Sequence, residues 1–221
     1  SNISHELKTP LFAIQGYIEA LQEGDIDDPE ISKQFLEKAS RNVDRLAFFI
    51  KDLDAISKLE SGEIPVNYDR FNLTDLIHEV IDSLELKAKK YNITLRFKEK
   101  YHSPTWVYAD REKIRQVLVN LIDNSFKYGK SGGSTSIKTF ELHDQILVEI
   151  TDDGIGIEEK YLPRLFERFY RTDKSRSRQI GGSGLGLAIV KHIIEAHQQT
   201  ITVRSTENIG STFGFTLQRD K

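Results

Sequence analysis

The sequence predicts an α+β protein, with an N-terminal helical hairpin followed by an α/β sandwich that contains a mixed sheet. Up to about residue 60, apolar residues recur at alternating steps of four and three, which is the period of amphipathic helices. Beyond residue 70, strand-like segments are interleaved with helical ones, which favours helices on one face of a mixed sheet over a parallel doubly wound sheet. We expect a linker at 63–70, where Gly62 and Pro65 interrupt the pattern.

The first 62 residues predict two antiparallel helices. An apolar stripe runs over residues 3–21, and a second stripe runs from Phe35 to Ile56. Between them, the glycine and proline of segment 24–29 end one helix and start the next. A single hairpin has too little surface to bury both stripes, whereas two hairpins can form a four-helix bundle. The sequence therefore predicts a homodimer through residues 1–62.

Residues 71–221 predict the second domain. Asn72 is a candidate cap for a helix that starts at Leu73, and further helices are expected at 110–127 and 184–196. Alternating apolar residues predict strands at 93–98, 106–108, 135–142, 145–151, 200–205 and 212–218. The His143-Asp144 step is the expected turn of a hairpin.

Composition narrows the function. A net charge of −3 provides no general attraction to nucleic acid or anionic lipid, so no nucleic-acid partner is expected. The sequence has no apolar run of about 18 residues, so no membrane span is expected. It has no cysteine, which excludes disulfides. Because it lacks methionine and starts within a helical pattern, we interpret it as part of a longer protein.

The first candidate site is His5-Glu6-Leu7-Lys8-Thr9-Pro10. Glu6 can accept the Nδ1 proton of His5, which leaves Nε2 as a nucleophile. Thr9 lies one helical turn from His5, where a hydroxyl can hold a water. The alternative is an ordinary exposed histidine. A zinc-protease motif is excluded, because Thr9 stands where that motif requires a second histidine.

The second candidate site begins with Asn120 and Asn124, one turn apart on a predicted helix that ends at Tyr128. Amide oxygens are hard, neutral ligands that suit Mg²⁺ with triphosphate oxygens, and Lys127 can neutralise phosphate. Tyr128 can pack against a nucleotide or bond to it. The alternative is the polar face of an amphipathic helix.

Two glycine clusters complete this site. Asp152 ends a strand, where its carboxylate can accept a hydrogen bond from the exocyclic amine of adenine, and Gly154 and Gly156 permit close backbone approach. The second cluster precedes a helix whose first N–H groups can meet phosphate oxygens. Its glycines are Gly182, Gly184 and Gly186.

A basic segment separates the glycine clusters. It predicts a lid over phosphates, with a nucleic-acid patch as the alternative. Its basic residues are Arg164, Arg168, Arg171, Lys174, Arg176 and Arg178. Two other nucleotide motifs are excluded, because Asn124 occupies the position of the first P-loop glycine and Leu187 that of the last dinucleotide-motif glycine.

In this order and spacing, the motifs resemble the catalytic core of bacterial sensor histidine kinases of two-component signalling, over essentially the whole chain. The matching segments are the H-box at 5–10, the N-box at 120–128, the G1 box at 152–157, the F-box at 166–169, the G2 box at 182–187 and a last glycine segment at 210–212. The resemblance implies a dimerisation and phosphotransfer hairpin followed by an ATP-binding domain of the gyrase, Hsp90 and MutL type.

The resemblance also implies chemistry. Mg-ATP would be the phosphoryl donor, His5 the acceptor with Glu6 as its general base, and an aspartate in the receiver domain of a response regulator the next acceptor. Thr9 would assist a phosphatase activity toward that regulator. The parent protein would be a membrane-anchored sensor, with this portion in the cytoplasm.

For the nucleotide, the resemblance implies Asn124 as the main Mg²⁺ ligand with Asn120 in support. Lys127 and Arg171 would contact phosphates, and Asp152 would bind adenine. The implied nucleotide site comprises Asn120, Asn124, Lys127, Tyr128, Asp152, Gly154, Gly156, Arg171, Gly182, Gly184, Leu185 and Gly186.

Three functions are weighed: a histidine autokinase, an ATP-hydrolysing conformational machine and an inactive scaffold. Hydrolytic relatives carry a glutamate at the position of Asn120, and a neutral amide cannot take a proton from water. This favours transfer to His5, and the intact boxes count against a scaffold. The sequence leaves open whether a subunit phosphorylates itself or its twin, because the handedness of the loop at 24–29 decides this.

Overall fold

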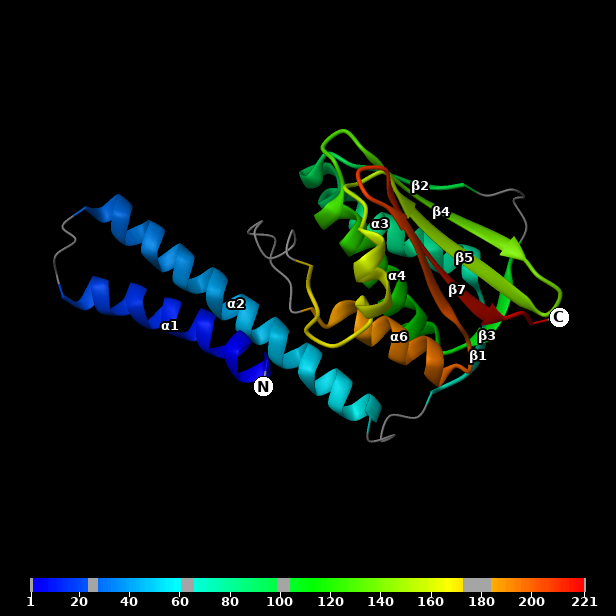
Figure 1. Ribbon diagram of the computed structural model, residues 1–221, viewed down its shortest axis with the longest axis horizontal. Coiled ribbons are helices and arrows are strands. Elements are labelled where there is room, and N and C mark those ends of the chain that lie inside the picture. The colour runs from blue at the N-terminus through cyan, green and yellow to red at the C-terminus, as the bar shows by residue number, and fades with distance from the viewer. Residues whose placement is uncertain (1, 24–27, 61–65, 99–103, 173–183, 221) are drawn as a thin grey trace.

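The computed structural model describes residues 2–23, 28–60, 66–98, 104–172 and 184–220. A long helical hairpin projects from one side of an α/β unit, and the two are visibly distinct in Figure 1. Among the helices in these ranges, none has both the length and the apolar character needed to cross a membrane.

The hairpin consists of α1 (Asn2–Gln22) and α2 (Pro29–Glu60), as the two apolar stripes predict. Pro29 suits the first turn of a helix because its missing N–H would have no intrahelical partner there. The Asp28 carboxylate accepts a hydrogen bond from the Glu30 N–H at 2.8 Å. Tyr17 and Phe35 pack across the hairpin, with ring centroids 5.5 Å apart.

The α/β unit is a two-layer sandwich. Its main sheet has the order β2 (Thr94–Phe97), β4 (Ser134–Glu141), β5 (Gln145–Asp152), β7 (Gly210–Gln218) and β6 (Ile201–Thr206). β2 pairs with β4 in parallel, and the other neighbours are antiparallel. The helices α3 (Leu73–Tyr91), α4 (Arg111–Tyr128) and α6 (Gly186–Ala196) lie on one face of this sheet (Figure 1). The predicted mixed sheet and sandwich are confirmed.

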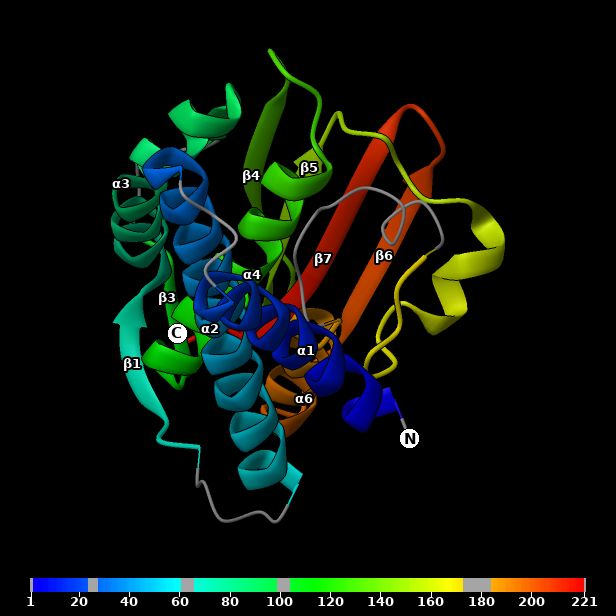
Figure 2. The same ribbon diagram turned by 90° about the vertical axis from the view of Figure 1, so that its left-hand side faces the viewer.

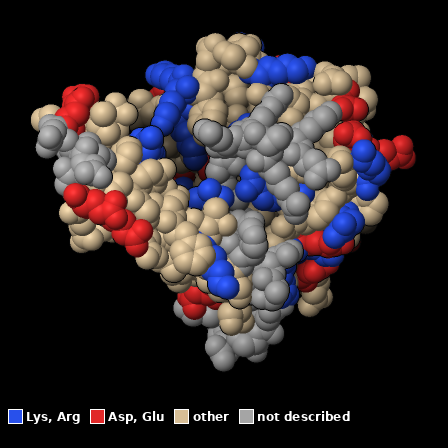
Figure 3. Space-filling model, turned by 60° about the vertical axis from the view of Figure 1, so that its left-hand side comes forward, with Lys and Arg blue, Asp and Glu red and all other residues tan. Residues whose placement is uncertain are grey.

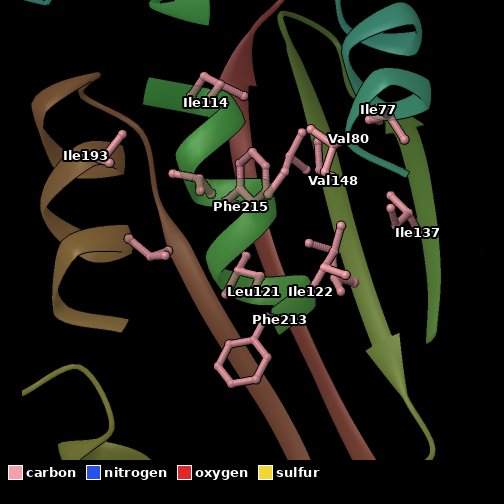
Figure 4. Close-up of a cluster of buried hydrophobic side chains, with 14 of the residues drawn as sticks. Ile77, Val80, Ile114, Leu121, Ile122, Ile137, Val148, Ile193, Phe213 and Phe215 are labelled. Carbon is pink, nitrogen blue, oxygen red and sulfur yellow. The ribbon is translucent and has the colours of Figure 1, made fainter. Parts of the chain in front are cut away.

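The core lies between the three helices and the sheet. Ile114 and Ile122 of α4 and Phe215 of β7 are fully buried, and Figure 4 shows these side chains pointing into the same layer. A side-chain cap fixes the start of α3 on this core. Asn72 accepts hydrogen bonds from the N–H groups of Thr74 and Thr105 at 3.1 and 3.0 Å, which confirms it as the cap of α3.

Two elements were not predicted. The strand β1 (Asp69–Asn72) pairs antiparallel with β3 (Trp106–Ala109) in a separate small sheet, so residues 69 and 70 of the expected linker are in a strand. Its sequence holds one apolar residue, Phe71, and therefore shows no alternation. A 3₁₀ helix, η1 (Glu159–Arg164), follows the loop after β5.

His197, at the end of α6, forms a buried polar junction with the start of α4. Its Nδ1 lies 2.7 Å from the Ile193 carbonyl oxygen, and its Nε2 accepts a hydrogen bond from the Asp110 N–H at 3.0 Å. The proton of the neutral ring is therefore on Nδ1. Burial lowers the pKa of His197, although the Ile193 carbonyl and the Asp110 carboxylate oppose this.

This junction predicts acid-sensitive stability. Because the pKa of His197 is lower in the folded protein than its ordinary value of 6.5, the unfolded chain binds a proton that the folded protein excludes. The stabilising contribution is complete above pH 6.5 and decreases as the pH falls. We expect His197→Gln to lower stability by about 1–2 kcal/mol at pH 7.5 and to reduce the loss between pH 7.5 and 5.5. Urea unfolding measures both; an unchanged pH dependence, equal to that of exposed His143→Gln, would contradict the assignment.

Candidate nucleotide site and phospho-acceptor helix

One pocket in the α/β unit collects most of the predicted nucleotide residues. It lies between the C-terminal half of α4, the loop that follows β5, and the segment that leads into α6. The predicted residues that line it are Asn120, Asn124, Lys127, Tyr128, Asp152, Gly156, Arg171, Gly184 and Gly186. Figure 3 shows Lys and Arg side chains gathered around a hollow on this side of the molecule. Such a site suits an anionic ligand.

α4 provides the polar wall of the pocket. Asn120 and Asn124 are four residues apart and therefore lie one helical turn apart on the pocket side of α4, while Leu121 and Ile122 between them face the core. The Nδ2 atom of Asn120 is buried and has no hydrogen-bond partner among the described residues. A buried donor without an acceptor in the protein is expected where a ligand or water supplies one. The residues present therefore fit a bound nucleotide.

The carboxylate at the end of β5 is the second polar feature. Asp152 Oδ1 accepts a hydrogen bond from the Gly154 N–H at 2.9 Å. Burial raises the pKa of Asp152 to about 6; the N–H groups of Gly154 and Ser211 oppose this, and the charge of Asp153 adds to it. At neutral pH the carboxylate is therefore mainly ionised and can accept a hydrogen bond from a ligand in the pocket.

The glycines of the G1 segment are required by close backbone packing. Gly156 has φ 64°, and a Cβ there would collide with the Thr206 carbonyl. A Cβ at Gly154 would collide with the Tyr128 carbonyl, against which the loop is held by a 3.0 Å hydrogen bond from the Ile155 N–H. These contacts pack the loop after β5 against the end of α4 and against the end of β6.

Other predicted residues lie elsewhere. The Leu185 side chain is fully buried in the core, and neither it nor Gly154 lines the pocket. Gly182 lies outside the described residues. Gly184 has φ 72° and its carbonyl accepts a hydrogen bond from the Phe169 N–H at 3.0 Å, so it holds the segment before α6 against the F-box.

Sequence reasoning missed the apolar wall of the pocket, because it searched for polar groups. The wall suits a flat heterocycle, and its members are Ile155, Ile157, Leu165, Leu187 and Phe213. The first two alternate with the G1 glycines, which was the available signal. Asp123 also lines the pocket, and Lys87 of α3 binds its carboxylate at 2.6 and 2.7 Å.

The candidate acceptor lies on α1. His5 and Glu6 are in the first turns of this helix, although their side chains lie outside the described residues. Thr9 is exposed and Pro10 is buried. Leu7 is half-buried and packs against the apolar cluster that includes Phe49 of α2, and α1 lies beside α2 (Figure 2).

α2 contacts the α/β unit. Phe49 is buried, and its ring centroid lies 5.8 Å from that of Phe169, beside the pocket segment.

Comparisons with known proteins agree with this architecture. Residues 109–221 match the family model described as histidine kinase-, DNA gyrase B- and HSP90-like ATPase. Residues 1–62 match the His Kinase A (phospho-acceptor) domain. The fold and the pocket thus define an ATPase-like nucleotide-binding domain joined to a phospho-acceptor hairpin. The chain belongs to the sensor histidine kinase family, as the motifs indicated.

Individual relatives point the same way. The chain is 36% identical over 219 residues to the sensor histidine kinase WalK of Bacillus subtilis and 41% identical over 230 residues to drug sensory protein A of Synechocystis. In both cases 98% of this chain is covered, but only 36% and 34% of the relative. The chain thus spans about a third of the length of these relatives.

Solved structures share the arrangement of both parts. The Acinetobacter baumannii histidine kinase AdeS is similar with a TM-score of 0.79 and 26% identity, covering 98% of each chain. Histidine kinase ThkA, in a complex with the response regulator protein TrrA, is similar with a TM-score of 0.80 and 28% identity, covering 99% of this chain and 60% of that one.

Proposed function

We propose that this chain transfers the γ-phosphoryl group of ATP to His5 and then to an aspartate in the receiver domain of a response regulator. The observation that carries the proposal is the combination of a phospho-acceptor hairpin containing His5 with a basic, partly apolar pocket that contains Asp152 and Asn124. ThkA, which was solved in a complex with a response regulator, supports this choice of partner.

The residues have separate roles in this proposal. Nε2 of His5 attacks the γ-phosphorus as the bond to the oxygen bridging to the β-phosphate breaks, so that ADP leaves. Glu6 accepts the hydrogen bond from Nδ1–H of His5, which keeps the lone pair on Nε2 and stabilises the positive charge that develops on the ring. Thr9, one turn further on, orients a water that hydrolyses the aspartyl phosphate of the regulator in the opposing phosphatase reaction.

The pocket binds and orients the nucleotide. Asp152 accepts a hydrogen bond from the adenine amine, and Ile155 and Phe213 pack against the base. Lys127 and Arg171 contact phosphates. Asn124 and Asn120 offer amide oxygens to Mg²⁺, which when bound neutralises phosphate charge. Because the amide of Asn120 cannot take a proton from water, slow hydrolysis is expected and transfer to His5 is favoured.

The test is incubation of the protein with γ-labelled ATP and Mg²⁺. We expect labelled protein whose label is lost in acid and retained in alkali, as a phosphorus–nitrogen bond requires. Acid-stable label would indicate a hydroxyl acceptor and contradict the proposal. Steady phosphate release without labelled protein would identify a hydrolase instead.

The hairpin supports a homodimer through residues 1–62. Large apolar side chains remain exposed along it, among them predicted stripe residues. They are Leu11, Phe12, Ile18, Ile31, Leu36, Val43 and Ile50. Monomeric proteins rarely expose a continuous apolar surface of this kind, so a second hairpin is the expected cover.

Dimerisation provides a prediction. Ile18→Glu combined with Val43→Glu places charge on the exposed stripe, and we expect the protein to become monomeric at micromolar concentration. Gln34→Glu, an exposed polar position on α2, is the control and should remain dimeric. Sedimentation equilibrium measures the mass; a double variant with the mass of a dimer would exclude this surface as the interface.

We place the regulator on the exposed face of the hairpin below His5, near Ala13 and Tyr17. The relatives of which this chain forms about a third support a longer parent protein, which we propose to be a membrane-anchored sensor with this portion in the cytoplasm.

A further inference from the structure

The turn between β6 and β7 packs directly against the G1 loop that carries Asp152. The Asn208 N–H in this turn donates a hydrogen bond to the Ile155 carbonyl at 2.7 Å. Two glycines permit the contact, one from each segment. A Cβ at Gly156 would collide with the Thr206 carbonyl, and a Cβ at Gly210 would collide with the Asp152 carbonyl. The turn and the loop therefore interlock, so that one cannot shift without the other.

Ser205, the second-last residue of β6, is at the centre of the contact. Its Oγ accepts a hydrogen bond from the Ile157 N–H at 2.9 Å and donates one to the Gly210 carbonyl at 2.9 Å. The Ser211 hydroxyl lies 2.9 Å away and, because the Ser205 proton is already used, donates to the same oxygen. One hydroxyl of β6 thus joins the G1 loop to the first two residues of β7.

The partners of Ser205 face the nucleotide pocket, although Ser205 itself does not. Ile157 and Ser211 line the pocket, whereas Ser205 and Asn208 are not among its lining residues. The Ser211 N–H also donates a hydrogen bond to the Asp152 carboxylate. Displacing Ser211 therefore displaces both a wall of the pocket and a donor that holds Asp152.

We propose that Ser205 is a positioning residue for nucleotide binding, which fixes the Asp152–Ile157 loop and the start of β7 in the geometry that receives adenine. This inference rests on the proposed ATP site. It assigns to the β6–β7 turn the role of a brace behind the pocket, acting without contact with the nucleotide.

The brace acts on the adenine side of the pocket and not on the chemistry at His5. Loss of the Ser205 hydroxyl should therefore lower the affinity for ATP, for ADP and for adenosine by the same factor. The KM for ATP should rise while the rate at saturating ATP is unchanged. Transfer from already phosphorylated His5 to a regulator should also be unchanged.

The first experiment compares Ser205→Ala with Ser205→Thr by calorimetric titration with ADP. We expect Ser205→Ala to lower the affinity for ADP roughly five- to tenfold, because three hydrogen-bonding groups lose their partner. Ser205→Thr, which keeps a hydroxyl, should retain most of the affinity. The matched control is Thr202→Val, which removes a hydroxyl that donates to the Gly214 carbonyl between the same strands at 3.3 Å but lies away from the G1 loop. It should leave ADP affinity unchanged. Equal losses in Ser205→Ala and Thr202→Val would reduce the role of Ser205 to sheet stability and overturn the proposal.

A second pair of variants tests the packing of the turn against the G1 loop while Ser205 is left unchanged. Gly210→Ala adds a Cβ against the Asp152 carbonyl and should lower the affinity for ADP more strongly than Ser205→Ala does. Gly132→Ala is the control, because Gly132 also has positive φ, at 80°, but open space around its Cβ position. Unchanged ADP affinity in Gly210→Ala, with a folded circular dichroism spectrum, would overturn the proposal. Failure of the wild-type protein to bind ADP at all would instead overturn the proposed nucleotide site.

Discussion

Replacing His5 with glutamine is expected to abolish phosphoprotein formation completely. Glutamine preserves the size and polarity of the side chain, but its amide nitrogen has no lone pair available to attack phosphorus. ATP affinity should remain within about twofold, since every described residue that lines the pocket belongs to the α/β unit. Labelling with γ-labelled ATP measures the first effect and calorimetric titration the second.

His143→Gln is the matched control for this variant, because His143 is exposed in the β4–β5 turn. It should be labelled at the wild-type rate. Label that persists in His5→Gln would show that another residue accepts the phosphoryl group. A parallel loss of ATP binding in His5→Gln would show that the substitution acts on the pocket.

Asp152→Asn is expected to have opposite effects on binding and on stability. Asparagine can keep the hydrogen bond from the Gly154 N–H through its oxygen, but it has no negative charge to hold the adenine amine. Since a hydrogen bond to a charged group contributes about 1.5–3 kcal/mol, we expect ATP affinity to fall roughly 10- to 100-fold.

The ligand-free Asp152→Asn protein should be more stable than the wild type at pH 7.5. The pKa of Asp152 is about 6 in the folded protein, against an ordinary value of 3.8. Between these values the folded protein binds a proton that the unfolded chain does not, so stability falls as the pH rises from 3.8 to 6. The full cost of the buried charge is present above pH 6. At 1.36 kcal/mol for each pKa unit, and with allowance for partial exposure, its removal should stabilise the fold by about 1–3 kcal/mol.

Two measurements check this pair of effects. Urea unfolding at pH 7.5 and pH 5 should show the gain in stability shrinking at the lower pH. Titration with adenosine, which carries no phosphate to complicate the pH dependence, should show wild-type affinity falling below pH 6 and that of Asp152→Asn staying constant. A variant that is less stable than the wild type at pH 7.5 would contradict the buried-charge explanation.

The sequence predicted the helices and the main sheet because their apolar periods are strong and local. It could not predict β1, because Asp69 and Arg70 pair with Ala109 and Tyr108, far along the chain, and local alternation is absent. The hairpin turn at His143-Asp144 was accessible for the opposite reason, since its two strands adjoin it.

The pocket shows the same division. Asp152 and Asn120 could be found because carboxylates and paired amides near glycines indicate nucleotide chemistry. Leu185 lies between two such glycines, and spacing cannot tell whether a side chain faces the pocket or the core; the structure buries it in the core. Ser205 was missed because its contact with Ile157 joins β6 to the loop after β5, far apart in the sequence, and carries no motif.

The contact between the hairpin and the α/β unit has a consequence for how such proteins can diversify. Phe49 of α2 and Phe169 form a described contact between the two parts, whereas exposed apolar side chains of the hairpin such as Leu36 and Val43 do not line the nucleotide pocket. Substitutions on that surface can change which partner is recognised without altering the residues that line the pocket. Selection can therefore alter signalling specificity and energy supply independently within one chain.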